Sequence, residues 1–511
     1  MGSLLNEVGG YRKRNSVYRI ALVYPNVYQI GMANLGFHTV YSIFNGYEGV
    51  SCERFFLGMK NSIETNSPLS AFDAVGVSLQ YELDYVNLIR ILEASGIETS
   101  RERRTGPLLI AGGPCCYNPV PLSRFLDLFI VGDLEPVADS LVQGLLSGHS
   151  PEEIAGACEG LFSPALMNPT VAQRAPDMDS IPAPVNQPRP TSPGFSPALG
   201  STFMIEISRG CNVRCRFCMY SHCTFPTRER SLQRIMEIVD EGIRVTGSRK
   251  VSLIGALVTD HSEIKEILSY LGDRGLTVSL PSIRSDMVDE EMLKLMERLQ
   301  VRTLTLAPEG SPHTRKLIKK NLDEEKIRFL INEAPGHGVK RLRLYFISGI
   351  PGQTGEDLDY ISDLGREAAA SFRGRGAVTA SINPLIPRPH TPTESLPIAE
   401  KRKLGAEYDL IRKSAPPRVS LKFQSIRQAH LQAYLALGGE KTGEVILGAS
   451  RQSGGSASWR RIAQSVGDPM DRVFRPPASM PWRIIDAGIS REYLQRQARE
   501  MMVHANPGKE P

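Results

Sequence analysis

Residues 209–218 read Arg209-Gly210-Cys211-Asn212-Val213-Arg214-Cys215-Arg216-Phe217-Cys218, and this stretch carries three cysteines at the spacing CxxxCxxC. It follows directly on an alternating apolar run at 203–207, which predicts a β-strand. Three thiolates on one short loop can bind three irons of a [4Fe–4S] cluster. We therefore expect Cys211, Cys215 and Cys218 to be the catalytic metal ligands, with the fourth iron open to a small molecule that brings its own nitrogen and oxygen.

A zinc site or a chance grouping fits these cysteines less well. Zinc normally takes four protein ligands, or three and a water molecule, and its sites usually contain CxxC pairs. A chance group of buried or disulfide-paired cysteines would not place three of the eight cysteines in one loop after a strand. The same bunching favours a reducing cytoplasm over a disulfide framework.

The composition is that of a soluble protein with several domains. Hydrophobic residues make up 41% of the 511 residues and charged residues 23%. No apolar run reaches the roughly 18 residues of a membrane span, so we expect a cytoplasmic protein without a membrane partner. The net charge of +5 neither requires nor excludes nucleic acid. Because no added nucleic-acid-binding domain is evident, we expect no such partner.

Residues 1–150 have the pattern of a doubly wound, Rossmann-like α/β domain. Four continuous apolar runs predict parallel strands that are covered on both faces. They lie at 18–24, 74–79, 107–111 and 128–131, with helical patterns at 85–94 and 135–146. Ligands of such sheets bind beyond the carboxyl ends of the strands. The candidate binding residues there are Ser78, Gln80, Gly112, Gly113, Gly132 and Asp133.

The next two parts are a linker and a second domain. Residues 151–198 are predicted to be a semi-rigid linker, because prolines are frequent between 176 and 197. Residues 199–395 contain six strand–helix units, which predict a partial (β/α)6 barrel with its chemistry at the carboxyl ends of the strands. The strands are expected near 203–207, 250–255, 276–280, 302–306, 341–347 and 378–382.

Residues 396–511 are predicted to be a mostly helical accessory region. Helical patterns cover 400–414, 426–437 and 490–503, and a short apolar run lies at 419–423. We see no internal repeat.

The aromatic Phe217 before the last cysteine completes a resemblance of the loop to the signature of the radical S-adenosylmethionine (SAM) enzymes. The resemblance implies that the open iron binds the amino and carboxylate groups of S-adenosyl-L-methionine, with Phe217 at this cofactor site. One electron from the cluster then cleaves S-adenosylmethionine to methionine and a 5′-deoxyadenosyl radical. An electron donor such as ferredoxin or flavodoxin is implied as a partner.

The resemblance assigns further strand-end residues to S-adenosylmethionine. Gly255 stands where the family often has Gly-Gly-Glu at the methionine amino group, although one glycine only is kept. Glu309 resembles the family glutamate at the ribose or amino group; a carboxylate at a helix N-terminus is the alternative. Gly349 and Pro351 resemble a Gly-x-Ile-Pro motif that lies along the adenine, where glycine permits close approach.

Ser282 and Arg284 follow the third predicted strand of the barrel. Side chains two residues apart on a strand end point the same way, and arginine is a bidentate partner for a carboxylate. We expect Arg284 to bind the carboxylate of S-adenosylmethionine with Ser282 beside it; the alternative is a surface arginine.

Residues from Ile20 to about Pro136 resemble the cobalamin-binding domains that precede the barrel in cobalamin-dependent radical SAM enzymes. The turn Tyr24-Pro25-Asn26-Val27-Tyr28-Gln29-Ile30-Gly31-Met32 carries the resemblance. Many such domains have Asp-x-His-x-x-Gly in this loop, with the histidine below the cobalt, whereas this chain has Asn26, Tyr28 and Gly31. The resemblance implies cobalamin without a histidine from this loop, with Tyr28 under the cobalt or holding a water there. The alternative is a relic domain without cobalamin.

The two resemblances together imply a radical SAM C-methyltransferase. The radical would abstract hydrogen from an unactivated carbon of a protein or peptide substrate, and methylcobalamin would supply the methyl group. One activity of this subgroup is Cα-methylation of a glutamine in methyl-coenzyme M reductase, a protein of methanogenesis, and this is our specific expectation.

Two other functions are open. A methylthiotransferase acting on tRNA or a ribosomal protein would hold a second cluster on three widely spaced cysteines of its first domain. Here Cys115 and Cys116 are adjacent, and with Cys52 and Cys158 they do not make that arrangement. A non-catalytic protein that uses its cluster for electron transfer or scaffolding would not need the strand-end residues Arg284, Glu309 and Gly349.

Overall fold

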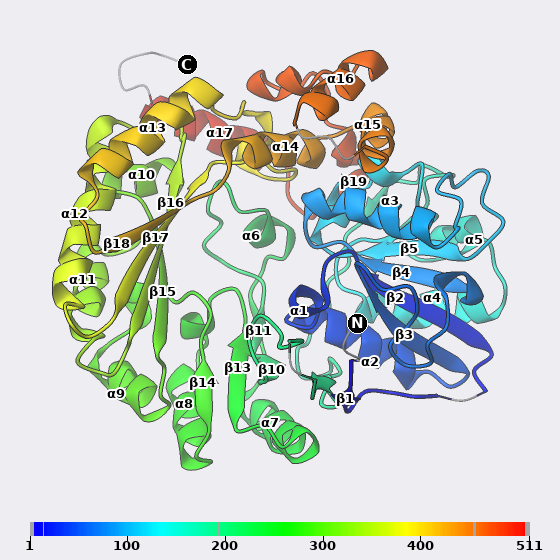
Figure 1. The fold of residues 1–511 in the computed structure, drawn as a ribbon, viewed down its shortest axis with the longest axis horizontal. Coiled ribbons are helices and arrows are strands. Elements are labelled where there is room, and N and C mark those ends of the chain that lie inside the picture. Colours follow the sequence, from blue (N-terminus) through cyan, green and yellow to red (C-terminus); the bar gives the residue numbers. More distant parts are fainter. Residues whose placement is uncertain (1–4, 14, 193, 453–455, 506–511) are drawn as a thin grey trace.

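The computed structural model describes residues 5–13, 15–192, 194–452 and 456–505. Two lobes lie side by side, an N-terminal α/β domain and a barrel-like domain, and helices of the C-terminal region run from one to the other (Figure 1). The predicted fold class, a doubly wound domain followed by a partial barrel and a mostly helical C-terminal region, is confirmed.

The first domain contains a six-stranded sheet of order β3-β2-β4-β5-β6-β7, in which the edge strand β7 alone is antiparallel. The strands are β2 (Tyr18–Tyr24), β3 (Val50–Phe56), β4 (Ala74–Ser78), β5 (Leu108–Gly112), β6 (Leu128–Ile130) and β7 (Leu161–Phe162). The four predicted strands are present, and β3 and β7 are additional.

Strand β3 does not follow the sequence pattern because Glu53 and Arg54 interrupt its apolar run. Both charges are nevertheless buried. Arg54 pairs with Glu7 at 2.5 Å and with Glu64 at 2.7 Å, and Glu53 pairs with Arg19 at 3.0 Å. Paired charges of this kind can occupy a buried strand where single charges cannot.

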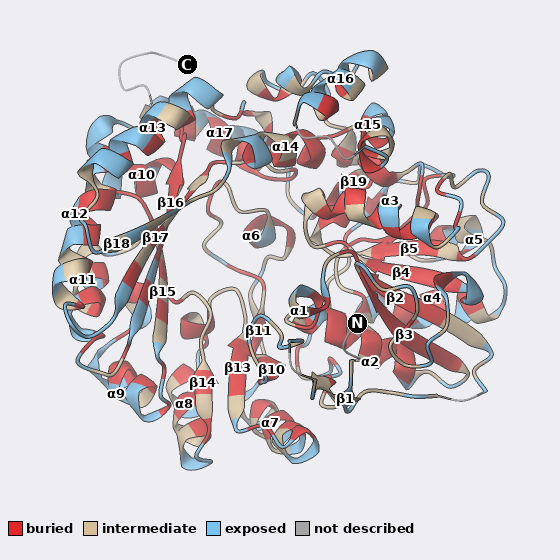
Figure 2. Ribbon diagram, in the orientation of Figure 1, coloured by how far each residue is buried: buried red, intermediate tan, exposed pale blue. Residues whose placement is uncertain are grey.

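The two faces of this sheet are covered by different parts of the chain. Helices α2 (Leu35–Gly46), α4 (Ala138–Leu146) and α5 (Pro151–Ala157) cover one face. On the other face, α3 (Tyr85–Ala94) is joined by α14 (Ile426–Ala436) and α15 (Glu440–Ser450) from the far end of the sequence. The C-terminal region is therefore part of the core of the first domain, as the buried strands and helices in Figure 2 indicate.

The barrel-like domain has seven parallel strands in two sheets, where the sequence predicted six. The strands are β10 (Phe203–Glu206), β13 (Lys250–Ile254), β14 (Thr277–Ser279), β15 (Thr303–Glu309), β16 (Arg341–Ser348), β17 (Ala377–Pro384) and β18 (Val419–Phe423). A parallel bridge between Ile283 and Leu306 joins the two sheets. The seventh strand, β18, is the apolar run assigned above to the accessory region, and it pairs with β17.

Helices between the strands cover the outside of this domain (Figure 1). They are α7 (Leu232–Thr246), α8 (Ile264–Asp273), α9 (Glu290–Arg298), α10 (Pro312–Leu317), α11 (Glu324–Glu333), α12 (Gly355–Ser371) and α13 (Lys401–Ser414). Their apolar faces and the strands form one continuous buried core. The strand ends are thereby held on a rigid support.

The predicted linker is tied to other segments. Strand β9 (Arg189–Pro190) pairs with β1 (Glu7–Val8), and β8 (Thr170–Val171) pairs with β19 (Ile485–Asp486). These short pairs connect both ends of the chain to the domain junction. In the part of the chain that the structure describes, no helix is long and apolar enough to cross a membrane.

Candidate active site

The three motif cysteines lie on a loop directly after the short strand β11 (Ser208–Arg209). Gly210 opens the loop with φ +93°, and a Cβ there would lie 2.3 Å from the carbonyl oxygen of Pro226. Only glycine allows this approach of the loop to the segment that returns after it. Cys218 closes the loop, where its N–H donates to the carbonyl of Cys215 at 3.0 Å.

The three thiols of this loop are free and differ in exposure. Cys211 and Cys215 are buried and Cys218 is partly exposed. Burial raises the pKa of Cys211, and it raises the pKa of Cys215 to about 12. Without metal Cys211 and Cys215 are therefore neutral thiols, and metal binding must displace their protons.

The spacing of the side chains bears on which metal centre fits. Among the described residues, no three His, Cys, Asp or Glu side chains are grouped to hold a single metal ion. In a [4Fe–4S] cluster each thiolate binds a different iron, so its ligands need not converge on one ion. Three free thiols on one loop match the three protein ligands of a cluster with one open iron, and they are one short of the four ligands of a structural zinc site.

A clamp from the end of the chain holds this loop. Arg216 is buried, and its guanidinium donates to the carbonyl of Leu317 at 2.8 Å. It also contacts Gln497 at 3.3 Å and Glu500 at 2.9 Å, both on α17 (Arg491–Ala505). Helix α17 therefore fixes the position of the cysteine loop, a role that the sequence alone did not indicate.

A cavity of about 390 Å³ lies in the interior of the barrel. Three of the residues predicted for S-adenosylmethionine line it, namely Phe217, Ser282 and Glu309. Glu309 has φ +64° and lies where the pairing register between β15 and β16 shifts. Such a backbone is unusual for a residue with a side chain, and it is typical of functional positions.

Glu309 forms an ion pair with Lys320 at 2.8 Å, and both groups are shielded from solvent. Burial works to lower the pKa of Lys320, but Glu309 and the nearby Cys215 outweigh it, and the net shift is upward. A cationic Lys320 therefore lies beside the cysteine loop. Sequence reasoning missed it, because no motif marks it.

Arg284 lines a different cavity, of about 690 Å³, together with residues of the cysteine loop such as Gly210 and Asn212. Its guanidinium is 2.6 Å from Asp286 and 3.5 Å from Asp260. The sequence predicted that the side chains of Ser282 and Arg284 point the same way, but they line different cavities. Both residues follow the end of β14 at Ser279, so the side-chain alternation of a strand no longer applies to them.

Gly349 has a structural reason to be glycine. Its φ is +73°, and a Cβ there would lie 2.7 Å from Leu404 of α13. Its N–H donates to Glu407 of the same helix at 2.8 Å. The missing side chain thus permits close approach of a helix; contact of Gly349 and Pro351 with an adenine stays a prediction.

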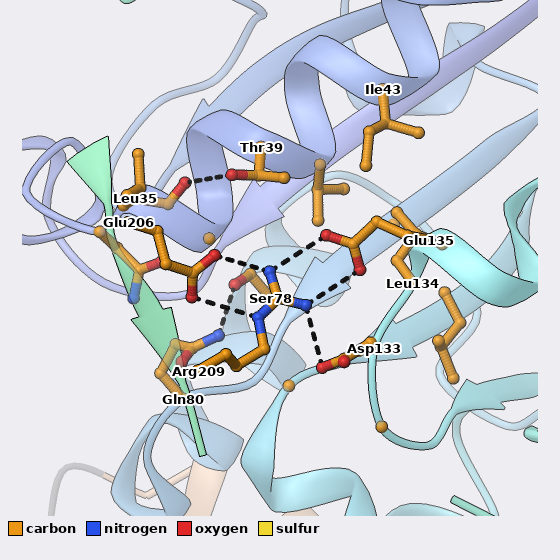
Figure 3. Close-up of a pocket in the computed structure, with 18 of the residues that line it drawn as sticks. Leu35, Thr39, Ile43, Ser78, Gln80, Asp133, Leu134, Glu135, Glu206 and Arg209 are labelled. Atoms are coloured by element: carbon orange, nitrogen blue, oxygen red, sulfur yellow. Dashed lines mark hydrogen bonds and ion pairs between the residues drawn. The ribbon is translucent and has the colours of Figure 1, made fainter. Parts of the chain in front are cut away.

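The first domain contains a cavity of about 570 Å³ at the carboxyl ends of its strands. All six residues predicted there line it: Ser78, Gln80, Gly112, Gly113, Gly132 and Asp133. Apolar side chains of α2 and of the facing sheet extend the cavity between them, among them Ile43 on α2 (Figure 3). Gly255, predicted for S-adenosylmethionine, also lines this cavity.

Asn26, Tyr28 and Gly31 lie elsewhere and do not line this cavity. Asn26 donates to Asp84 at 2.9 Å, and the hydroxyl of Tyr28 donates to Glu7 at 2.5 Å within the buried network of Arg54. A Cβ on Gly31 would lie 2.3 Å from the ring of Phe56. The turn is therefore a packing element, and its expected position below a cobalt atom is not what the structure has.

Arg209 joins the two domains within this cavity. Its guanidinium lies 3.1 Å from Asp133 and 3.1 Å from Glu135 of the first domain, and 2.7 Å from Glu206 of the barrel (Figure 3). Arg228 also pairs with Asp133, at 3.0 Å. Since Arg209 directly precedes Gly210, the cavity and the cysteine loop share one wall. The position of Arg209 in the cysteine motif could have marked it as a functional residue, but its partners could not be predicted from the sequence.

Comparison with known proteins identifies two matching family models. One, described as "Radical SAM proteins, N-terminal", matches residues 36–152, and the other, described as "Radical SAM superfamily", matches residues 205–364. Together they cover parts of both lobes.

Individual relatives and a solved structure are also similar. An uncharacterized protein of Methanocaldococcus jannaschii is 31% identical over 429 residues, which cover 83% of this chain and 89% of that protein. The tRNA-2-methylthio-N(6)-dimethylallyladenosine synthase of Sorangium cellulosum is 26% identical over 266 residues, 44% of this chain and 49% of that protein. The radical S-adenosylmethionine methyltransferase TsrM of Kitasatospora setae, solved with cobalamin and a [4Fe–4S] cluster, has the same fold: TM-score 0.58, 13% identity, 90% of this chain and 99% of that chain.

Proposed function

The chain belongs to the radical SAM superfamily, and we propose that within it the protein is a cobalamin-dependent methyltransferase that acts on carbon. When bound, the cluster supplies the electron that splits S-adenosyl-L-methionine into methionine and a 5′-deoxyadenosyl radical, and cobalamin supplies a methyl group. The residues of the chain hold, orient and shield these groups.

The cluster would be held by Cys211, Cys215 and Cys218. S-adenosylmethionine would bind between the cysteine loop and the barrel, where Glu309 lines one cavity and Arg284, together with residues of the loop, lines another. Glu309 is kept in place by Lys320, so its carboxylate is available as an acceptor for hydroxyl or amino groups. Phe217 packs against apolar side chains that keep water from the loop.

One observation carries the proposal of cobalamin. The cavity of the first domain is lined by residues of both lobes, among them Gln80 and Gly113 on one side and Arg209 and Gly255 on the other. A ligand in it would therefore face the cysteine loop. Proximity of this kind lets a radical formed in the barrel be captured before side reactions.

We propose a protein or peptide substrate methylated at an unactivated carbon, with the glutamine of methyl-coenzyme M reductase as the first candidate. The barrel cavity supports a substrate with hydrogen-bonding groups, because Asn383, Tyr345 and Gln424 line it. In the described chain the side chains of Asn383 and Tyr345 have no hydrogen-bond partner, and groups of this kind are free to bind a ligand.

The test uses anaerobically reconstituted protein, S-adenosylmethionine with a deuterated methyl group, and a peptide that copies the glutamine segment. The proposal predicts a labelled methyl group on carbon, with one S-adenosylhomocysteine and one 5′-deoxyadenosine for each methylation. Formation of both small products without a methylated peptide would exclude the glutamine segment as the substrate, while the proposed reaction type would stand.

The second candidate is a methylthiotransferase, which the similarity to the Sorangium synthase favours. The cysteines argue against it. Cys52 lies in the core on the α2 side of the first sheet, whereas Cys115 and Cys116 lie in the core on its other side. They are therefore not placed to share one cluster. A sulfur-bearing adduct in the peptide assay would reverse this ranking.

A further inference from the structure

Three cationic side chains surround one aromatic ring beside the cysteine loop. The ring is that of Tyr493 on α17, and Arg214, Lys319 and Arg496 lie 5.2, 5.5 and 5.6 Å from its centroid. We call these four residues the Tyr493 face. Arg214 belongs to the cysteine motif itself, between Cys211 and Cys215. The face therefore lies directly over the loop.

These charges are poorly neutralised within the chain. In the described residues neither Arg214 nor Lys319 forms an ion pair. Arg496 has Glu500 at 3.9 Å, but that carboxylate is shared with Arg216 at 2.9 Å. Arg496 is 61% exposed, and Arg499, one turn along α17, is also exposed. Clustered cations cost repulsion that an acidic partner would relieve.

A packed path leads from this face to a motif cysteine. The ring of Tyr493 lies 6.3 Å from the ring of His222, centroid to centroid. The Nδ1 of His222 lies 2.9 Å from the carbonyl oxygen of Cys218. Two contacts thus connect this partly exposed face with the backbone of Cys218, and both rings are aromatic.

We propose that the Tyr493 face docks an acidic protein that carries a one-electron redox group and passes its electron to the cluster. The inference rests on the proposed function for the presence of the cluster. In the step the donor loses one electron and the cluster gains one, and no bond is made or broken. The charge of the face orients the partner, and the path through Tyr493 and His222 gives the short route.

A nucleic acid would also be attracted by cations around an aromatic ring. The path through Tyr493 and His222 to Cys218 favours the redox partner, because binding of RNA requires no chain of aromatic contacts to a motif cysteine. RNA is therefore an outcome of the test and not the proposal.

The test compares the full chain with the double variant Arg496→Glu/Arg499→Glu. The matched control is Arg244→Glu, because Arg244 is 74% exposed on α7, at the opposite end of the barrel from α17 (Figure 1). Flavodoxin serves as the acidic donor. Its binding is measured with the chain before cluster reconstitution, so this arm does not depend on the proposed function. After reconstitution, the rate at which flavodoxin reduces the cluster is measured. The rate of reduction by the methyl viologen radical, a small cation, is measured for comparison.

The expected result is about a tenfold or larger loss of flavodoxin affinity and of its reduction rate in the double variant, with both quantities falling as salt is added. Reduction by methyl viologen and the behaviour of Arg244→Glu change by less than about twofold. The variant Arg496→Lys/Arg499→Lys keeps the charge and is expected to keep the rate. Unchanged flavodoxin binding in the double variant would overturn the inference, and so would loss of binding to a labelled RNA oligonucleotide with flavodoxin reduction intact. Absence of a cluster in wild-type protein, with flavodoxin binding as expected, would contradict the proposed function and not the docking face.

Discussion

The guanidinium of Arg209 and the carboxylate of Glu135 lie 3.1 Å apart across the junction of the two domains. Arg209 is two residues before Cys211, and Glu135 follows the turn of Gly132 and Asp133 in the first domain. The contact therefore links the cysteine loop to the turn that lines the first cavity. Movement of one domain relative to the other would disturb both at once.

The variant Arg209→Gln tests this junction. It leaves the largely buried carboxylates of Asp133, Glu135 and Glu206 without their shared partner, and loss of one member of a buried ion network costs about 3–5 kcal/mol. Urea unfolding measures the change. Arg234→Gln is the control, because its pair with Glu237 is exposed and is worth less than about 1 kcal/mol. Equal stability of the two variants would contradict the role given to Arg209.

Replacement of Cys211, Cys215 or Cys218 by alanine is expected to abolish formation of 5′-deoxyadenosine and to lower the bound iron. The reason is that each thiolate holds a different iron of the cluster. Cys158→Ala is the matched control, since Cys158 is a partly exposed residue that directly follows α5 of the first domain, away from the loop. The assignment fails if all three variants still produce 5′-deoxyadenosine.

Lys320→Met tests the ion pair beside the loop. The methionine keeps much of the volume but leaves Glu309 without its cation at 2.8 Å. We expect the dissociation constant of S-adenosylmethionine to rise about tenfold, which corresponds to about 1.4 kcal/mol for a lost charged contact. Lys294→Met, at a 68% exposed lysine, is the control. Equilibrium binding to reconstituted protein gives the answer, and equal affinities in both variants would remove Glu309 from the site.

Gly76→Val tests the first-domain cavity. Gly76 lines this cavity, and a Cβ there would lie 3.4 Å from its nearest neighbour, Leu22. The strand therefore accommodates the branched valine side chain, which would occupy part of the cavity. We expect cobalamin binding to be lost while S-adenosylmethionine cleavage continues. Gly46→Ala is the control, because a Cβ there meets nothing within 4 Å. Retention of cobalamin in Gly76→Val would place it outside this cavity.

The features that the sequence predicts well are local ones. The cysteine loop, four strands of the first domain and the turn residues Ser78 and Gly113 follow from motif spacing and from apolar runs, and the structure has them in those positions. Parallel strands bring their carboxyl ends to one edge, so the turns could be expected to meet there.

Features that depend on distant partners were not predictable. Strand β3 can be buried because Arg54 forms ion pairs with Glu7 and Glu64, and no local sequence pattern predicts these pairs. Tyr28 was expected below a cobalt atom, but the packing of its ring against Phe56 holds it in the core. Strand β18 completes the barrel sheet although α13 intervenes after β17 in the sequence. In each case tertiary contacts decide the outcome.

The central claim is that one chain binds a single [4Fe–4S] cluster on its cysteine loop and cobalamin in its first domain. The most direct measurement is the iron and cobalamin content of protein reconstituted without oxygen in the presence of both. The account predicts about four irons and one cobalamin per chain. About eight irons with no cobalamin would contradict it, because that result requires a second cluster in the first domain.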